Sequence, residues 1–153
     1  DGPPDTFEVG ASAPPRGTET VLLVEDERVV RETAARLLER HGYRVIATRH
    51  GGDALLAWRE HAAEIDVLLT DLRMPEVGGE SLVARLRAER PTLPVVVMSG
   101  YADGQDSQEK ALLAGELFLE KPFTTEALLV QLRAALARGG ARPGGARPGG
   151  AAR

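Results

Sequence analysis

Short apolar runs alternate with stretches of helical periodicity along most of this sequence, and that alternation restricts the fold more than any other feature. The apolar runs are rich in Val and Leu and predict five strands, at Thr20–Val24, Arg44–Ala47, Asp66–Thr70, Pro94–Met98 and Leu117–Glu120. Three of these runs are continuously apolar, as expected for strands that helices cover on both faces. The periodic stretches predict five helices, at Glu27–His41, Gly51–His61, Gly79–Glu89, Asp103–Ala114 and Thr124–Ala137. The pattern is typical of an α/β domain with a parallel sheet.

Five consecutive strand–helix units leave few topologies, because crossovers between parallel strands are right-handed. We expect a single doubly wound (βα)5 domain of the flavodoxin-like kind, with strand order 2-1-3-4-5 and helices on both faces of the sheet. Ligands of such sheets bind at the carboxyl ends of the strands, beside the point where the strand order reverses. The helix at Asp103–Ala114 has little to bury in its first half, so we expect it to be the most mobile element.

The two ends of the chain differ in composition from the part between them. Residues 1–17 and 138–153 hold nine of the 17 Gly and six of the 10 Pro, and the second segment repeats the sequence ARPGG. Such segments cannot bury a core, so we expect a flexible linker at 1–17, a folded domain at 18–137 and a disordered tail at 138–153. The first residues lack an initiator Met and the features of a secretory signal, which indicates a segment cut from a longer protein.

Charge and apolar patterning exclude several classes of function. Between residues 18 and 137 there are 14 basic and 20 acidic residues, and this acidic balance argues against a nucleic-acid partner. No apolar run approaches the roughly 18 residues of a membrane-spanning helix, so we expect no membrane contact and a cytoplasmic location. The chain has no Cys, which excludes disulfides and thiolate metal sites.

Polar residues that can carry chemistry follow the predicted strands. Glu25 and Asp26 follow the first strand and Asp71 follows the third, and these two strands are neighbours in the expected sheet. Three carboxylates at one edge repel each other unless a cation neutralises them. Mg²⁺ fits well because it binds through one or two carboxylates and accepts a phosphate oxygen, and Ca²⁺ satisfies the same argument. The ammonium of Lys121, after the fifth strand, is a further neutralising cation.

The chemistry that suits this set is phosphoryl transfer to a carboxylate, which needs positioning and charge neutralisation more than an acid or a base. Asp71 is the best candidate nucleophile because its strand is central in the expected sheet. Ser99, after the fourth strand, can hydrogen-bond a phosphoryl oxygen, and Lys121 can pair with another. Each of these residues alone is better explained as a turn or loop residue.

These residues also carry a resemblance to a known family. The sequence from Thr20 to Ala137 resembles the receiver domain of two-component response regulators. The resemblance rests on the acidic pair in VLLVEDE, the phosphoacceptor motif TDLRMP, the hydroxyl in MSGYA and the lysine in FLEKPF. Four motifs in order across five strand–helix units make a specific match.

The resemblance implies a role for each motif residue. Asp71 would take a phosphoryl group from a phosphohistidine of a histidine kinase or a histidine phosphotransfer domain. Asp26, Asp71 and the backbone carbonyl of Arg73 would bind Mg²⁺, with Glu25 acting through a water. The domain would promote its own phosphorylation and dephosphorylation, which leaves open whether its parent chain is an enzyme.

The resemblance also implies a switch. Ser99 would be the switch hydroxyl, Lys121 the phosphoryl partner and Phe118 the switch aromatic. Phosphorylation would change the face made by the fourth helix, the fifth strand and the fifth helix. A cis peptide bond would join Lys121 to Pro122, and Arg73 and Tyr101 would tune dephosphorylation.

Other functions explain the same residues less well. A hydrolase with an aspartyl-phosphate intermediate needs a second acid two residues after its nucleophile, where this chain has Arg73. The glycine-rich turn of a dinucleotide-binding domain is missing. We favour the receiver of a bacterial hybrid sensor histidine kinase, with a free-standing regulator or a phosphorylation-independent interaction module as alternatives.

Overall fold

The computed structural model describes residues 15–74, 76–100 and 115–139. Within them, five parallel strands form one sheet in the order β3-β2-β4-β5-β6. The strands are β2 (Thr20–Val24), β3 (Arg44–Thr48), β4 (Val67–Asp71), β5 (Val95–Ser99) and β6 (Leu117–Glu120). Counted along the chain this is the order 2-1-3-4-5, so the predicted fold class is confirmed.

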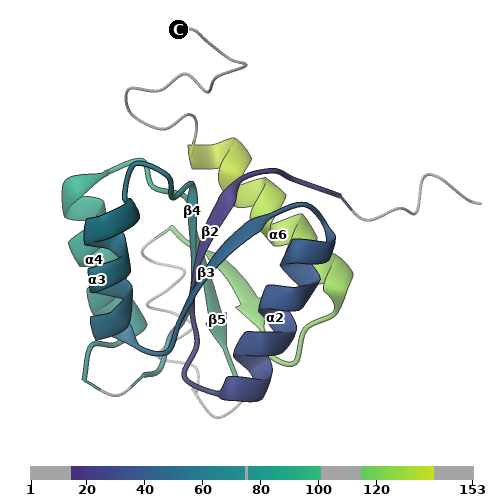
Figure 1. The fold of residues 1–153 in the computed structure, drawn as a ribbon, viewed down its shortest axis with the longest axis horizontal. Coiled ribbons are helices and arrows are strands. Elements are labelled where there is room, and N and C mark those ends of the chain that lie inside the picture. The colour runs from purple at the N-terminus through teal and green to yellow at the C-terminus, as the bar shows by residue number, and fades with distance from the viewer. Residues whose placement is uncertain (1–14, 75, 101–114, 140–153) are drawn as a thin grey trace, which may run out of the picture.

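Helices cover both faces of the sheet (Figure 1). The described helices are α2 (Arg28–Arg40), α3 (Gly51–His61), α4 (Gly79–Glu89) and α6 (Thr125–Gly139). Figure 1 shows α3 and α4 together on one face, and α2 and α6 on the other. The helix predicted at Asp103–Ala114 lies outside the described residues. None of the helices described is both long enough and apolar enough to cross a membrane.

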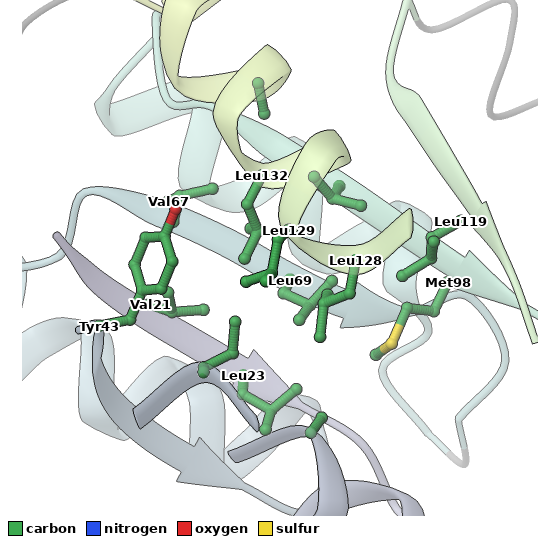
Figure 2. Close-up of a cluster of buried hydrophobic side chains, with 14 residues drawn as sticks. Val21, Leu23, Tyr43, Val67, Leu69, Met98, Leu119, Leu128, Leu129 and Leu132 are labelled. Atoms are coloured by element: carbon green, nitrogen blue, oxygen red, sulfur yellow. The ribbon is translucent and has the colours of Figure 1, made fainter. Parts of the chain in front are cut away.

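The sheet separates two hydrophobic cores because successive side chains of a strand point to opposite faces. In β2, Val21 and Leu23 pack with α2 and α6, whereas Leu22 and Val24 pack with α3 and α4. Figure 2 shows the first core, in which three leucines of α6 meet the sheet. The two cores pack against the two faces of the sheet, and the polar residues discussed above lie at the carboxyl ends of its strands.

Three strands end one residue later than the apolar pattern predicts: β3 at Thr48, β4 at Asp71 and β5 at Ser99. Asp71 pairs with Met98 and Ser99 pairs with Glu120, so both polar residues are the last of their strands. A parallel ladder uses only main-chain groups, and it therefore continues after the apolar side chains stop. The amide of Leu72 still donates to the carbonyl of Met98, at 2.8 Å. Asp71 and Ser99 are accordingly held by the sheet and not by the loops.

A buried arginine joins α3 to the end of α4. The Arg90 side chain donates to the carbonyls of Ala62 and Ile65, and its guanidinium lies 4.7 Å from the ring centre of Trp58. The Trp58 indole in turn donates to the carboxylate of Glu89. The guanidinium thus satisfies main-chain acceptors in the segment that follows α3.

Arg90→Met should therefore lower the free energy of unfolding by about 2–3 kcal/mol, because it leaves buried carbonyls without a charged donor. Urea denaturation measures the change. Arg59→Met removes the same charge from an exposed position of α3 and should change stability by less than about 0.5 kcal/mol. Equal stabilities of the two variants would contradict the structural role of Arg90.

An ion pair ties the start of β2 to α6. The Arg133 guanidinium donates to the carboxylate of Glu19 at 2.7 Å and to the hydroxyl of Tyr43 at 3.3 Å. Burial alone raises the pKa of Glu19, but hydrogen bonds from Arg133 and from nearby backbone amides outweigh it, so the pKa lies below its ordinary value. Glu19 therefore contributes stability as a carboxylate.

The contribution of Glu19 should depend on pH with a defined sign. Because the folded state holds the pKa below the ordinary 4.5, the stabilisation is present above that pH and is lost as the pH falls through the folded value. The unfolding free energy of Glu19→Gln should be lower than that of the wild type at pH 7, and the two should converge in acid. Denaturation curves at several pH values, with exposed Glu39→Gln as control, check this; a constant difference down to low pH would refute it.

Candidate functional site

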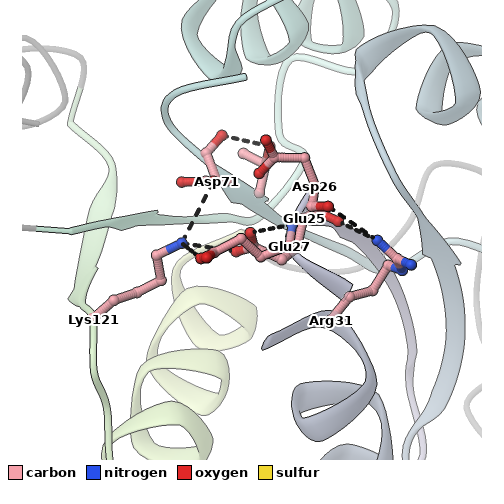
Figure 3. Close-up of polar contacts among 7 residues, drawn as sticks. Glu25, Asp26, Glu27, Arg31, Asp71 and Lys121 are labelled. Carbon is pink, nitrogen blue, oxygen red and sulfur yellow. Dashed lines mark hydrogen bonds and ion pairs between the residues drawn. The ribbon is translucent and has the colours of Figure 1, made fainter. Parts of the chain in front are cut away.

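Three carboxylates converge at the carboxyl edge of the sheet. Glu25 and Asp26 directly follow β2, Asp71 ends β4, and the two strands are hydrogen-bonded neighbours. One carboxylate oxygen from each residue lies within 4.8 Å of the others. Figure 3 shows Asp71 and Lys121 on one side of the turn that carries Glu25 and Asp26. The structure thus brings together the acids that the strand-end argument predicts.

Glu25 is the most buried of the three acids, with no exposed surface. Its carboxylate accepts from the amide of Glu27 at 3.0 Å and from the ammonium of Lys121 at 2.9 Å. Burial raises the pKa of Glu25 although both hydrogen bonds oppose the shift. Asp26 is exposed and Asp71 is buried, so the Asp26 carboxylate is the part of the cluster that is open to solvent among the described residues.

Lys121 supplies the cation of the site. Its ammonium lies 2.9 Å from a Glu25 oxygen, 3.5 Å from an Asp71 oxygen and 4.0 Å from a Glu27 oxygen. Burial alone lowers the pKa of Lys121, but the interactions with Glu25 and Asp71 outweigh it and raise the pKa. The Lys121 amide donates to the Ser99 carbonyl, and the peptide bond from Lys121 to Pro122 is cis.

Ser99 occupies the end of β5, next to β4. Its side chain is fully buried, and its hydroxyl has no hydrogen-bond partner among the residues that the structure describes. A buried hydroxyl normally finds a partner. The hydroxyl of Ser99 therefore has hydrogen-bonding capacity available at the same sheet edge as Asp71.

Of the three remaining residues that the motifs suggest, the structure describes Phe118 and Arg73. Phe118 in β6 is half-buried against the core beneath α3 and α4, and its carbonyl accepts from Gln131. Arg73 lies exposed in the loop after β4. Tyr101 lies outside the described residues.

Residues of α2 also contribute to the site, although they do not lie at strand ends. Arg31 donates to main-chain carbonyls of the acidic turn. In the sequence, the feature that could have pointed to Arg31 is a cation in the first turn of a helix, where cations are disfavoured.

A largely apolar groove of about 500 Å³ also borders Lys121, and its other walls include Val29, Val30 and Phe123. Val29 is exposed in this groove, whereas Val30 and Phe123 are partly buried.

The donor set suits a hard divalent cation. All three acids offer oxygen ligands, and the exposed position of Asp26 leaves room for water. A neutralising ammonium and a buried hydroxyl lie at the same sheet edge. Such an arrangement can bind a metal ion and a tetrahedral anion side by side.

Known proteins share this sequence pattern and fold. The sequence model of the response regulator receiver domain matches residues 21–133. A sensor kinase, CckA of Brucella abortus, is 35% identical over 80% of this chain and 13% of its own length. The transcriptional regulatory protein CseB of Streptomyces avermitilis is 38% identical over 78% of this chain and 50% of its own length. The chain therefore spans half or less of these two relatives.

Solved structures agree with the sequence relatives. A response regulator receiver domain protein from Clostridium thermocellum has a TM-score of 0.73 at 26% identity, covering 78% of this chain and 95% of that one. The receiver domain of the hybrid histidine kinase CckA has a TM-score of 0.63 at 33% identity, covering 76% of this chain and 98% of that one. With a family match over most of its length and neighbours of the same fold, the chain belongs to the response regulator receiver domain family of two-component signalling.

Proposed function

We propose that this domain accepts a phosphoryl group on Asp71 and uses the modified state as a signal. The observation that carries the proposal is the convergence of the Glu25, Asp26 and Asp71 carboxylates within 4.8 Å, with the Lys121 ammonium 3.5 Å from Asp71. A phosphoryl group brings more negative charge to a site that is already acidic. Such a site can accept it only with cations in place.

Mg²⁺ is the metal that we propose for this site. Glu25, Asp26 and Asp71 would hold it, together with the backbone carbonyl of Arg73, and Glu25 would act through a water. The all-oxygen donor set and the solvent access at Asp26 fit the preference of Mg²⁺ for carboxylates and retained waters. When bound, the ion would neutralise charge on the phosphoryl oxygens.

The transfer itself is an in-line displacement. A carboxylate oxygen of Asp71 forms a bond to phosphorus while the bond from phosphorus to the donor's imidazole nitrogen breaks, and the electron pair leaves with the imidazole. Lys121 would pair with a phosphoryl oxygen, and the 3.5 Å between its ammonium and an Asp71 oxygen supports this role. The sheet holds Asp71 at the end of β4, so the nucleophile needs no reorganisation.

The signal would arise at Ser99 and Phe118. The Ser99 hydroxyl is buried and lacks a partner among the described residues, so a phosphoryl oxygen on Asp71 would give it one. Movement of Ser99 would open space for the half-buried ring of Phe118. The face made by the helix predicted at 103–114, β6 and α6 would then change shape, and Arg73 and Tyr101 would tune how long the phosphoryl group survives.

The phosphodonor would be a histidine kinase or a histidine phosphotransfer domain. Receiver domains interact with such proteins, and the groove beside Lys121 offers apolar surface next to the acceptor. Val29 is 75% exposed there and adds to this apolar surface. That this domain contacts no nucleic acid stays a prediction, because relatives include DNA-binding regulators such as NtrC of Proteus hauseri.

A hybrid sensor kinase is our proposal for the parent protein. The kinase CckA of Brucella abortus supports it, since the matching receiver is 13% of that protein. The similarity to CseB supports a transcriptional regulator instead. The full reading frame that contains this segment distinguishes the two parent proteins. A kinase domain upstream would support the hybrid sensor kinase, and a DNA-binding domain downstream would overturn that proposal.

Incubation with acetyl phosphate tests the proposed activity without requiring a cognate kinase. We expect intact mass spectrometry to show one phosphoryl adduct in the presence of Mg²⁺ and none after chelation with EDTA. An adduct that forms equally well without a divalent cation would contradict the role of the acidic cluster. No adduct under any condition, together with no Mg²⁺ binding, would favour a phosphorylation-independent interaction module.

A further inference from the structure

Arg31 is a charged residue that the phosphoryl chemistry above does not use. It lies in the first turn of α2, and its amide donates to the carbonyl of Glu27, the N-cap residue just before the helix. The amino-terminal end of a helix carries partial positive charge, so a cation is disfavoured there. No acidic residue occurs in that turn to compensate. The position therefore calls for an explanation other than helix stability.

The side chain of Arg31 reaches back over the acidic turn. Its Nη1 lies 2.9 Å from the carbonyl oxygen of Glu25 and 3.5 Å from that of Asp26. Figure 3 shows the guanidinium on the side of the turn opposite to Lys121 and Asp71. Arg31 thus holds the main chain of the two residues whose side chains face Asp71.

We propose that Arg31 is a positioning residue for the metal site: it fixes the main chain of Glu25 and Asp26 so that their carboxylates converge with that of Asp71. The Glu27 amide holds the Glu25 carboxylate from within the turn, and Arg31 holds the carbonyls from outside it. Groups that orient metal ligands without touching the metal commonly change metal affinity by about 10–100-fold. This inference rests on the proposed function, because it takes Mg²⁺ as the ion.

An electrostatic role and a positioning role of Arg31 predict opposite changes in Mg²⁺ affinity when the residue is replaced. A nearby cation repels Mg²⁺, so removal of its charge alone would strengthen Mg²⁺ binding. Loss of the hydrogen bonds to the turn would weaken binding instead, because the ligands would have to be ordered on binding. The sign of the change therefore separates a positioning role from a purely electrostatic one.

The experiment is a calorimetric titration of Mg²⁺ alone into the wild type and into three variants: Arg31→Ala, Arg31→Lys and Arg28→Ala. We expect the dissociation constant of Arg31→Ala to rise about tenfold or more. Arg31→Lys keeps the charge and one donor group, and should lie between Arg31→Ala and the wild type. Arg28→Ala removes the same charge from the same turn, where Arg28 makes an exposed ion pair with Glu32, and should stay within about twofold of the wild type.

Thermal unfolding shows that each variant is folded at the titration temperature, and Arg31→Lys carries the test if Arg31→Ala is not. Unchanged or tighter Mg²⁺ binding by a folded Arg31 variant would overturn the inference and leave the proposed function intact. A wild type that neither binds Mg²⁺ nor accepts a phosphoryl group would overturn the proposed function itself.

Discussion

Asp71→Asn should abolish phosphorylation by acetyl phosphate in Mg²⁺, leaving no adduct where the wild type gives one. The amide that replaces the carboxylate has no anionic oxygen to attack phosphorus, and it removes one of the three charges that would hold the metal. Asn has the size of Asp, so both hydrophobic cores should persist. Intact mass spectrometry reports the adduct, and circular dichroism reports the fold.

A surface aspartate provides the matched control. Asp53 on α3 pairs with Arg49 and contributes nothing to the acidic cluster, so Asp53→Asn should give the wild-type adduct. An adduct on Asp71→Asn at the wild-type level would show that another residue is the acceptor. Loss of the adduct in both variants would point to a general effect of the substitutions and would contradict the assignment of Asp71.

Periodicity and apolar runs were sufficient to predict the sheet, its strand order and the described helices. The central strands β2, β4 and β5 are buried along their whole length, so a nearly continuous apolar run marks each of them. The ends of β3, β4 and β5 were less accurate, because Thr48, Asp71 and Ser99 stay in the ladder through their main chains. Side-chain polarity does not report main-chain pairing.

The candidate site was predictable to the extent that sheet topology determines proximity. Glu25, Asp26 and Asp71 meet because their strands are neighbours, and Lys121 reaches them from the end of β6. Contacts made by a side chain with distant main-chain atoms were not predictable, since they depend on rotamers and on the exact path of a turn. Arg31 is such a case: the sequence shows that it is charged, but only the structure shows that it donates to the carbonyls of Glu25 and Asp26.

Lys121→Met should have two large effects at pH 7. Phosphorylation by acetyl phosphate should slow by about 10²–10³-fold, as when one preorganised donor to a developing charge is removed from an active site. In the absence of Mg²⁺ the free energy of unfolding should also fall by about 3 kcal/mol, because the buried Glu25 carboxylate loses its partner. Single-turnover rates and urea denaturation measure the two effects, with Arg59→Met as the charge-matched surface control. A phosphorylation rate within about threefold of the wild type would contradict the role of Lys121, since that is far below the expected loss.

Two independent treatments, Mg²⁺ and acid, should restore the stability of Lys121→Met. Together they identify the cause of its stability loss. Mg²⁺ binds only the folded state, and here it would supply the cation that the cluster lacks, so it should stabilise this variant more than the wild type. Acid should act in the same direction. Burial already raises the pKa of Glu25, and loss of the Lys121 interactions raises it further, so the folded variant binds a proton that the unfolded chain does not. Its stability should therefore rise as the pH falls from 7 toward 5, whereas a defect caused by lost side-chain packing would respond to neither treatment.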